Sequence, residues 1–288
     1  MTEIAILITS FNRKDNTLDC LKSINSQKNG SYNTSIFLVI DGSTDGTSEA
    51  VSEQYPNVNI IYGNGSLFWA GGMRLCYSSA SKSKKFDHFL LLNDDTVLFE
   101  DSFNNLLENY SQLKKDSILI GSTQGNNPIT ENFTYGGRIL VNTYNSKSKI
   151  VLPNNQNPQL CHLGNANIML IPAEVINRIG FLSDKFVHAI ADYEFTLRAK
   201  KNGINSYISS KYLGVCHIND NQVKQWKNGK KSSLKERVEY LYSVKGLSYN
   251  EYMFYIKKYF PLYVPKAWFL LWVKTIFPFL WDKLKKRK

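Results

Sequence analysis

Cysteine is scarce in this sequence of 288 residues, and the few cysteines form no recognisable pair. Cys20, Cys76, Cys161 and Cys216 lie far apart, with no two separated by only two residues. This spacing excludes the C-x-x-C pattern of zinc and redox sites and suggests no disulfide framework. We therefore expect reduced thiols, as in a cytoplasmic protein.

Long hydrophobic runs are also lacking. The first apolar run, Ile4 to Ile8, is too short for the core of a signal peptide. The most apolar stretch, Tyr259 to Lys288, is interrupted by Lys266, Lys274 and three prolines. A membrane-spanning helix needs about 20 consecutive apolar residues, so we expect this stretch to lie on a membrane rather than to cross it.

The sequence also lacks an even distribution of charge along its length. The net charge is +11, yet residues 1–223 hold 19 lysines and arginines against 20 acidic residues, and residues 224–288 hold 16 against 4. All the excess positive charge therefore belongs to the C-terminal fifth. The sequence predicts a near-neutral domain over 1–223 and a basic, aromatic, helical region over 224–288. The apolar blocks of that region are too continuous for a solvated groove that binds nucleic acid.

What the sequence does contain, over its first hundred residues, is an alternation of short β-rich runs and helix-compatible stretches. Such an alternation indicates an α/β fold, in which a mostly parallel sheet is flanked by helices and ligands bind at the carboxyl ends of the strands. The expected strands are 4–11, 35–43, 58–64 and 88–94, and the expected helices are 16–27, 47–54 and 72–82. A later strand should lead into a helix between Pro172 and Gly180, and another helix should end at Gly203.

Polar side chains follow each expected strand at the point where it ends. Because the carboxyl ends of parallel strands share one edge of a sheet, these side chains should meet along one rim. They are Thr9, Ser10 and Arg13 after the first strand, Asp41 after the second, Asn64 after the third, and Asn93, Asp94 and Asp95 after the fourth.

The adjacent carboxylates Asp94 and Asp95 end the strand "HFLLL" in the motif "NDD". Carboxylate oxygens at a strand end suit a hard divalent cation, Mg²⁺ or Mn²⁺, which usually shares its site with phosphate. Because neighbouring side chains of a strand point to opposite faces, only one of the two should be a direct ligand. The alternative is a solvated turn, for which Asn and Asp are equally suited.

Five motifs together resemble the family 2 inverting glycosyltransferases of the GT-A (Rossmann-like) fold. They are "LITSFNR", "VIDGSTDGT", "YGNGSLFWAGGMR", "LLLNDDT" and "ADYEFTLRAKKNG", and they cover about Ile4 to His217 in the order seen in that family. The resemblance implies that Thr9, Ser10 and Arg13 line a nucleotide pocket and that Asp41 contacts the base. "NDD" resembles the family's D-x-D motif, so that Asp95 would bind the metal bridging the diphosphate, while Asn93 replaces the first acid.

The resemblance also implies a catalytic base. An inverting transfer needs one carboxylate to accept the proton of the acceptor hydroxyl. The family places it in an acidic pair at the start of a helix, where this chain has Ala191 followed by Asp192. We predict Asp192 as the base and Glu194 as the fallback. The alternative is that Asp192 only caps the helix and Glu194 belongs to a solvated face.

Four further roles are expected at other positions of the chain. His217 resembles the histidine that completes the metal site in relatives, although a lone histidine is more often structural. Arg74 could meet the diphosphate, and Asn64 belongs to the same nucleotide-binding rim. Phe68 and Trp69 are expected in a flexible loop that could stack on a sugar or close over the donor. The alternative is an aromatic cluster in the core, which suits Phe68 equally well and Trp69 less.

The C-terminal region combines Trp268, Trp272 and Trp281 with a cluster of terminal cations. Tryptophan at the headgroup level and lysine against anionic lipid are requirements of peripheral anchoring, here at the inner face of a bacterial cell membrane. The alternative is a pair of helices packed on the body or forming a homodimer interface.

Within the family, the chain looks like rhamnosyltransferase-like enzymes of bacterial surface polysaccharide (O-antigen or capsule) assembly. That likeness implies a dTDP- or UDP-sugar donor, with dTDP-L-rhamnose as one candidate, and a lipid-linked glycan acceptor. Two other functions are compatible with the residues: an inactive module that binds sugar nucleotides or membranes, and a glycoside hydrolase.

Overall fold

The computed structural model describes residues 1–28, 30–125, 132–188, 190–216 and 232–279. By its internal contacts the chain divides into two units. The N-terminal unit comprises Met1–Ile139, Lys149–Val187 and Ala191–His217. The C-terminal unit takes the rest of the chain, so the short segments Leu140–Ser148 and His188–Ile190 belong with the basic region.

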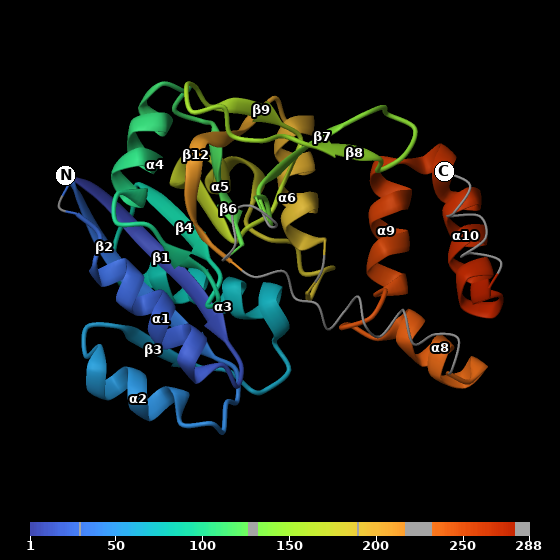
Figure 1. Ribbon diagram of the computed structural model, residues 1–288, viewed down its shortest axis with the longest axis horizontal. Helices are drawn as coiled ribbons and strands as arrows, with labels where there is room; N and C mark the ends of the chain where they lie inside the picture. Colours follow the sequence, from blue (N-terminus) through green and yellow to red (C-terminus); the bar gives the residue numbers. More distant parts are fainter. Residues whose placement is uncertain (29, 126–131, 189, 217–231, 280–288) are drawn as a thin grey trace. The chain divides into compact units, whose positions relative to one another are not determined.

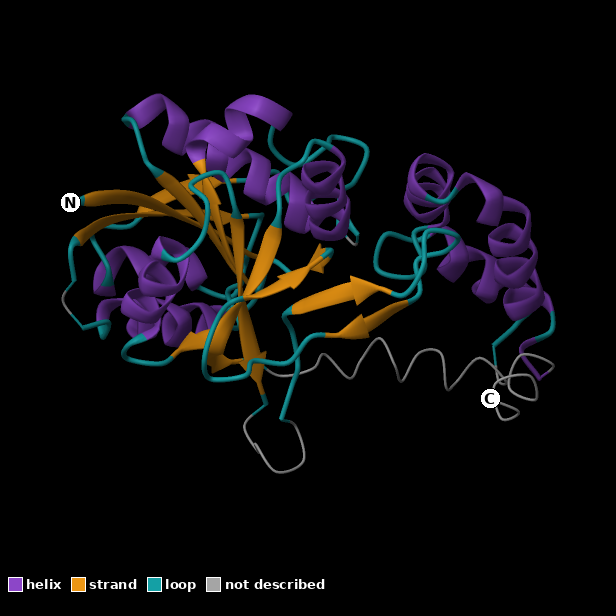
Figure 2. Ribbon diagram, turned by 90° about the horizontal axis from the view of Figure 1, so that it is seen from above, coloured by secondary structure: helices purple, strands orange, loops and turns teal. Residues whose placement is uncertain are grey.

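The N-terminal unit is built on a mixed sheet in the order β3-β2-β1-β4-β11-β6-β12-β5 (Figure 1). Its first four strands are parallel, and helices flank both faces of the sheet (Figure 2). This confirms the predicted α/β fold with a mostly parallel sheet. The elements of this half are β1 (Thr2–Ser10), α1 (Lys14–Asn25), β2 (Tyr32–Ile40), α2 (Thr47–Gln54), β3 (Asn59–Tyr62), α3 (Phe68–Ser83) and β4 (His88–Leu92).

The second half of the sheet is mixed because β11 lies antiparallel between β4 and β6. The predicted helix between Pro172 and Gly180 follows β11, the second predicted helix follows it along the chain, and Gly180 and Gly203 lie just after the two helices with positive φ. A separate three-stranded sheet has the order β10-β7-β8. The elements are β5 (Val97–Leu98), α4 (Ser102–Ser111), β6 (Ile118–Gln124), β7 (Gly137–Leu140), β8 (Ser148–Ile150), β9 (Gln159–Cys161), β10 (Leu163–Gly164), β11 (Ile168–Pro172), α5 (Ala173–Ile179), α6 (Ala191–Lys201) and β12 (Ser206–Val215).

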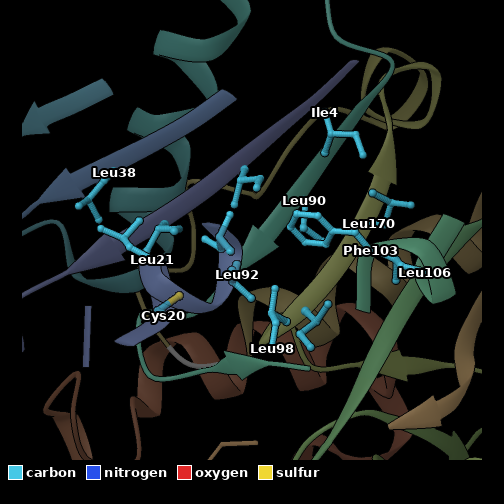
Figure 3. Packing of buried hydrophobic residues seen from close by; sticks show 14 of the residues in the cluster. Ile4, Cys20, Leu21, Leu38, Leu90, Leu92, Leu98, Phe103, Leu106 and Leu170 are labelled. Carbon is cyan, nitrogen blue, oxygen red and sulfur yellow. The ribbon is translucent and has the colours of Figure 1, made fainter. Parts of the chain in front are cut away.

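The main core lies between the sheet and helices α1 and α4. β1 and β4 are buried on both faces, which is why their sequences are continuous apolar runs rather than alternating ones. Leu21 of α1 and Phe103 of α4 pack against Leu90 and Leu92 of β4 in one cluster (Figure 3). This packing fixes where the chain leaves β1 and β4, and so positions the rim.

Helix α3 begins at Phe68, four residues before the predicted start at Gly72. Phe68 and Trp69 therefore lie in its first turn rather than in a flexible loop. The physical reason is that the Asp41 carboxylate accepts the backbone N–H groups of Gly65, Leu67 and Phe68, at 2.8, 2.8 and 3.2 Å. Satisfying these otherwise unpaired donors stabilises the start of the helix.

From residue 232 on, the described part of the C-terminal unit is helical. It contains α8 (Leu234–Tyr242), α9 (Tyr249–Tyr259), the 3-10 turn η2 (Pro261–Tyr263) and α10 (Val264–Ile276). Ser233 and Glu236 form a capping box at the start of α8, and Leu241, Ile256 and Ala267 are buried among the helices. None of the described helices combines the length and the hydropathy that crossing a bilayer requires.

Candidate active site

The chain leaves β1 and β4 at one edge of the sheet, where the strand order reverses. From β1 the chain proceeds outward to β2 and β3 and then returns to β4 on the other side of β1. In open α/β sheets the crevice beside such a switch point is where ligands bind. Arg13 follows β1, and Asn93, Asp94 and Asp95 follow β4, so the predicted nucleotide and metal residues meet at this point.

Arg13 joins the two predicted carboxylates. Its Nη1 donates to Asp94 Oδ1 at 2.9 Å, and its Nη2 donates to Asp95 Oδ2 at 2.7 Å. Burial lowers the pKa of Arg13, but the charges of Asp94 and Asp95 outweigh it and raise that pKa overall. The guanidinium is therefore a fixed positive charge between two acids, and "NDD" is not simply a solvated turn.

Asp94 and Asp95 differ in their surroundings. Asp94 is buried, and burial raises its pKa to about 7, against the lowering effect of Arg13. Its Oδ2 has no hydrogen-bond partner in the described part of the chain. Asp95 is less buried, and its Oδ1 lies 3.5 Å from the Cys216 thiol. Asp95 is thus the more accessible of the two, as the prediction that it binds the metal requires.

The oxygen atoms of Asp95 and the unpaired Oδ2 of Asp94 fit a hard divalent cation. Mg²⁺ and Mn²⁺ sites in nucleotide enzymes often use only one or two carboxylates and complete their coordination with phosphate oxygens and water. No group of three His, Cys, Asp or Glu side chains with metal-site geometry exists among the described residues. The predicted ligand His217 lies outside those residues.

Asn93, which replaces an acid, has a defined partner. Its Oδ1 accepts the indole N–H of Trp69 at 2.8 Å, and its carbonyl accepts the backbone N–H of Thr96 at 3.1 Å. The side chain therefore connects the "NDD" turn with the first turn of α3. Trp69 thus contacts the site through its polar edge.

The other predicted nucleotide residues lie along the same rim with varied partners. Thr9 faces α3 so closely that a Cβ on Gly72 would come within 2.1 Å of its Oγ1. The Ser10 hydroxyl is buried in a hydrogen bond of 2.8 Å with Thr17. The Asn64 side chain is exposed, and its Oδ1 accepts the backbone N–H of Ser66 at 3.0 Å.

Arg74 and Asp41 have contacts that the sequence did not predict. Arg74 Nη1 donates to the carbonyls of Ser183 and Phe186, at 2.9 and 2.8 Å, and so holds the segment that leads towards α6. Asp41 is buried, with its carboxylate on the start of α3. Contacts of Arg74 with a diphosphate and of Asp41 with a base stay predictions.

Asp192 lies in the first turn of α6, as predicted. Its Oδ2 accepts the backbone N–H of Ala166 at 3.3 Å and the side-chain amide of Asn165 at 3.4 Å, and its Oδ1 accepts the N–H of Tyr193 at 2.8 Å. Burial raises its pKa to about 6, although these donors act in the opposite direction. A carboxylate in this pKa range is a suitable proton acceptor near neutral pH.

The residues that lead into β11, 165–167, connect the Asp192 carboxylate to the "NDD" motif. The N–H of Ala166 donates to Asp192, and the carbonyl of the next residue, Asn167, accepts the N–H of Asn93 at 3.1 Å. One dipeptide therefore contacts both parts of the site. Neither contact could be predicted from the sequence, because residues 93, 166 and 192 are far apart along the chain.

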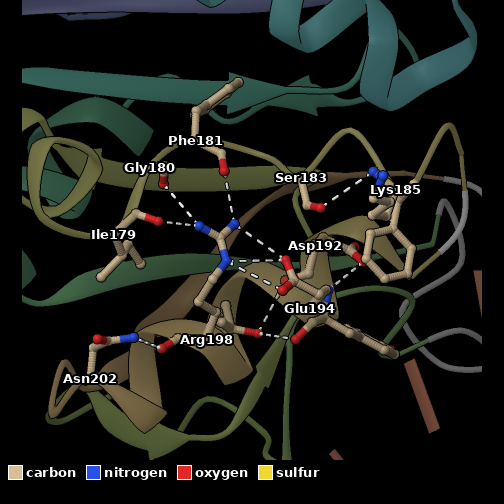
Figure 4. A network of polar contacts seen from close by, with 12 residues as sticks. Ile179, Gly180, Phe181, Ser183, Lys185, Asp192, Glu194, Arg198 and Asn202 are labelled. Carbon is tan, nitrogen blue, oxygen red and sulfur yellow. Dashed lines mark hydrogen bonds and ion pairs between the residues drawn. The ribbon is translucent and has the colours of Figure 1, made fainter. Parts of the chain in front are cut away.

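Glu194 is occupied by a structural ion pair. Its carboxylate is fully buried and contacts Arg198, with Nη2 to Oε2 at 3.2 Å. Figure 4 shows the Arg198 guanidinium between Glu194 and the carbonyls of Ile179, Gly180 and Phe181. Such a carboxylate is poorly placed to accept a proton from a substrate, which favours Asp192 over the fallback Glu194.

Cys216 was not predicted to belong to the site. It is buried, its thiol lies beside Asp95, and it accepts the amide of Asn167 at 3.3 Å. Burial raises the pKa of this thiol, so it is present as the neutral S–H group. The only signal in the sequence was its position directly before His217.

Comparison with known proteins agrees with this geometry. Residues 5–178 match the family model described as glycosyl transferase family 2. A search of the curated proteins gives no significant match. Among solved structures, residues 1–349 of S. aureus TarS in complex with UDP are similar at a TM-score of 0.54 and 13% identity, over 84% of this chain and 66% of that one.

A second similar structure is the mannosyltransferase PcManGT from Pyrobaculum calidifontis in complex with GDP-Man and Mn²⁺. It has a TM-score of 0.54 and 12% identity, over 79% of this chain and 61% of that one. At these identities the likeness shows a common fold, and this chain spans about two thirds of the length of each of the two structures. The match over residues 5–178 covers more than half of the chain, which therefore belongs to glycosyl transferase family 2.

Proposed function

We propose that this protein transfers a sugar from a nucleotide-diphosphate donor to a hydroxyl group of its acceptor, with inversion at the anomeric carbon. The observation that carries the proposal is the dipeptide Ala166–Asn167, which contacts the carboxylate of Asp192 and the backbone of Asn93. It sets a proton acceptor beside the motif that would hold the diphosphate. Family membership and the binding of UDP or GDP-Man by structures of the same fold support this assignment.

The residues have distinct roles in this proposal. Asp192 accepts the proton of the acceptor hydroxyl as that oxygen attacks the anomeric carbon. Asp95, with Asp94 behind it, would hold a divalent cation, which when bound neutralises charge on the departing diphosphate. Asn93 and Trp69 fix the turn that carries these carboxylates. Thr9, Ser10, Arg13 and Asp41 line the nucleotide side of the rim.

A glycoside hydrolase would need two carboxylates on opposite sides of the scissile bond. The first turn of α6 holds only Asp192 and Glu194, and the latter is paired with Arg198. A hydrolase also has no need of a nucleotide-binding rim, and membership of glycosyl transferase family 2 favours transfer over hydrolysis. An inactive module that only binds sugar nucleotides or membranes would be distinguished from the proposed enzyme by the absence of turnover.

The experiment that tests the proposal supplies labelled nucleotide sugars, dTDP-L-rhamnose and UDP-GlcNAc first, together with a bacterial lipid extract as acceptor. We expect label to enter the lipid fraction from one donor, and NMR of the product to show the inverted anomer. Retention of configuration, or release of free sugar alone, would contradict an inverting transferase.

For the acceptor we propose a lipid-linked glycan, which the C-terminal unit would meet at an anionic membrane surface. Leu262, Trp268 and Phe269 are exposed on η2 and the first turns of α10, and Lys266 lies among them. Exposed aromatic and basic side chains in one short segment are suited to the headgroup region of a bilayer.

We expect the full-length protein to sediment with vesicles that contain phosphatidylglycerol and to bind neutral vesicles less well. Replacing both Trp268 and Phe269 by alanine should weaken that binding about 100-fold or more, because each large side chain contributes roughly 1.5–3 kcal/mol when buried. Tyr62→Ala, which removes an exposed aromatic ring in the N-terminal unit, is the control. Equal binding by all three proteins would exclude this segment as the anchor.

A further inference from the structure

The guanidinium of Arg13 lies where the proposed cation would be needed. It contacts one oxygen of each carboxylate, at 2.9 Å for Asp94 and 2.7 Å for Asp95. Among the described residues, the second oxygen of Asp95 accepts only a weak contact from the Cys216 thiol, at 3.5 Å. A divalent ion on Asp95 would therefore face a positive charge a few ångströms away.

Repulsion from Arg13 makes the binding of a metal ion to Asp95 less favourable in free energy. Like charges at such a separation repel by several kcal/mol even at an effective dielectric constant of 20. In the free protein, a metal ion would have to displace a charge-assisted hydrogen bond, and Arg13 would have no new acceptor. A diphosphate changes this balance, since its oxygens are good bidentate acceptors for a guanidinium.

The side chain of Arg13 can change partner without movement of its loop. Its backbone is at the N-cap of α1, and the preceding residue, Asn12, is held by hydrogen bonds with Ser43 Oγ and the Thr44 N–H. The Arg13 side chain is 35% exposed, against 16% for Asp95 and 5% for Asp94. The acids are thus fixed, and the arginine is the member of the group that has access to the rim.

We propose that Arg13 makes metal binding at Asp95 conditional on the nucleotide diphosphate. In the free protein the guanidinium offsets part of the negative charge of Asp94 and Asp95. When the diphosphate binds, Arg13 transfers to the phosphate oxygens, and the metal ion takes its place on Asp95. This inference rests on the proposed function, because it requires a diphosphate ligand. It adds a coupling between the two ligands, which by thermodynamic linkage must be reciprocal.

The test measures Mn²⁺ binding to the full-length protein by calorimetry and by EPR of free Mn²⁺, without nucleotide and with UDP or dTDP. For the wild type we expect weak Mn²⁺ binding alone and at least about tenfold tighter binding with one of the nucleotides, within the usual range of coupling. Arg13→Gln should bind Mn²⁺ alone about tenfold more tightly than the wild type and should lose most of the enhancement by nucleotide.

Two further variants serve as controls for the Mn²⁺ binding experiment. Lys22→Gln removes an exposed cation from the same helix and should behave as the wild type does. Arg13→Lys keeps the charge without the two-pronged contact, so it should bind Mn²⁺ with an intermediate affinity. It also serves if Arg13→Gln does not fold, as judged by circular dichroism.

The coupling would be overturned if UDP or dTDP binds to the wild type but leaves its affinity for Mn²⁺ unchanged. It would also be overturned if Arg13→Gln binds Mn²⁺ no more tightly than the wild type. If Arg13→Gln does not fold, the same result for Arg13→Lys would overturn it. Binding of UDP or dTDP without any Mn²⁺ uptake would also overturn it, because Arg13 would then be the permanent counter-charge. If neither nucleotide binds, the donor assignment is contradicted, whereas the Mn²⁺ affinities of the variants still test displacement of Arg13.

Discussion

Asp192→Asn is expected to reduce sugar transfer by about 10²- to 10⁴-fold, the usual contribution of a general base. The amide cannot accept the proton of the acceptor hydroxyl, although it has nearly the same shape as the carboxylate. Donor binding should be retained, because the variant leaves the rim at β1 and β4 unchanged. The measurement is the rate of labelled sugar transfer at saturating donor, with nucleotide affinity determined in parallel.

The pH dependence gives a second readout of the same residue. The pKa of Asp192 is raised to about 6, so its carboxylate is ionised above that pH and increasingly protonated below it. Transfer by the wild type should therefore be nearly constant above about pH 7 and fall about tenfold per pH unit well below pH 6. In Asp192→Asn this decline should be absent from the residual rate.

Asp184→Asn is the matched control, because it removes an exposed carboxylate from the segment before α6. Its rate should equal that of the wild type. If Asp192→Asn transferred sugar at the wild-type rate, the assignment of the base would be wrong. If it lost donor binding together with transfer, its role would be structural.

Arg198→Met is expected to cause the largest loss of stability, about 3–5 kcal/mol. The change removes the Arg198 charge from the fully buried carboxylate of Glu194 and removes the donor from the carbonyls of Ile179, Gly180 and Phe181. For a protein of this size the melting temperature should fall by roughly 10 °C. Denaturant unfolding, followed by circular dichroism, measures the change in free energy.

An exposed ion pair serves as the control for this prediction. Lys28 and Asp101 are 2.8 Å apart, closer than Arg198 and Glu194 at 3.2 Å, but their side chains are 56% and 50% exposed against 17% and 0%. Lys28→Met should cost less than about 1 kcal/mol, because solvent screens an exposed pair. Equal effects of the two variants would show that burial does not determine the strength of the Arg198 contact.

The sequence predicted the first half of the fold well because each element there has a local signal. α2 was predicted with its observed bounds, and the four parallel strands were predicted within a few residues. The start of α3 was not, because it depends on Asp41, whose carboxylate accepts N–H groups from 24 to 27 positions further along the chain. Contacts over such a separation leave no local pattern.

The candidate site shows the same limit. The residue types at the strand ends indicated which side chains gather at the rim, since parallel strands end together. Their partners could not be predicted, because Arg13 bonds to acids more than 80 positions away and Arg74 to carbonyls more than 100 away. Glu194 was predicted as the fallback base, with a solvated face as the alternative, and it is instead buried against Arg198, four positions along α6.

The measurement that tests the central claim most directly is the thermal stability of the protein with UDP, dTDP, GDP and CMP sugars, each with Mn²⁺, Mg²⁺ or EDTA. A ligand at 100 times its Kd adds about 2.7 kcal/mol, which corresponds to roughly 5 °C for a chain of this size. We predict such a rise for sugars of one base, in the presence of metal, and a smaller one in EDTA or in Asp95→Asn. No rise with any nucleotide sugar under any condition would contradict a donor site at the ends of β1 and β4.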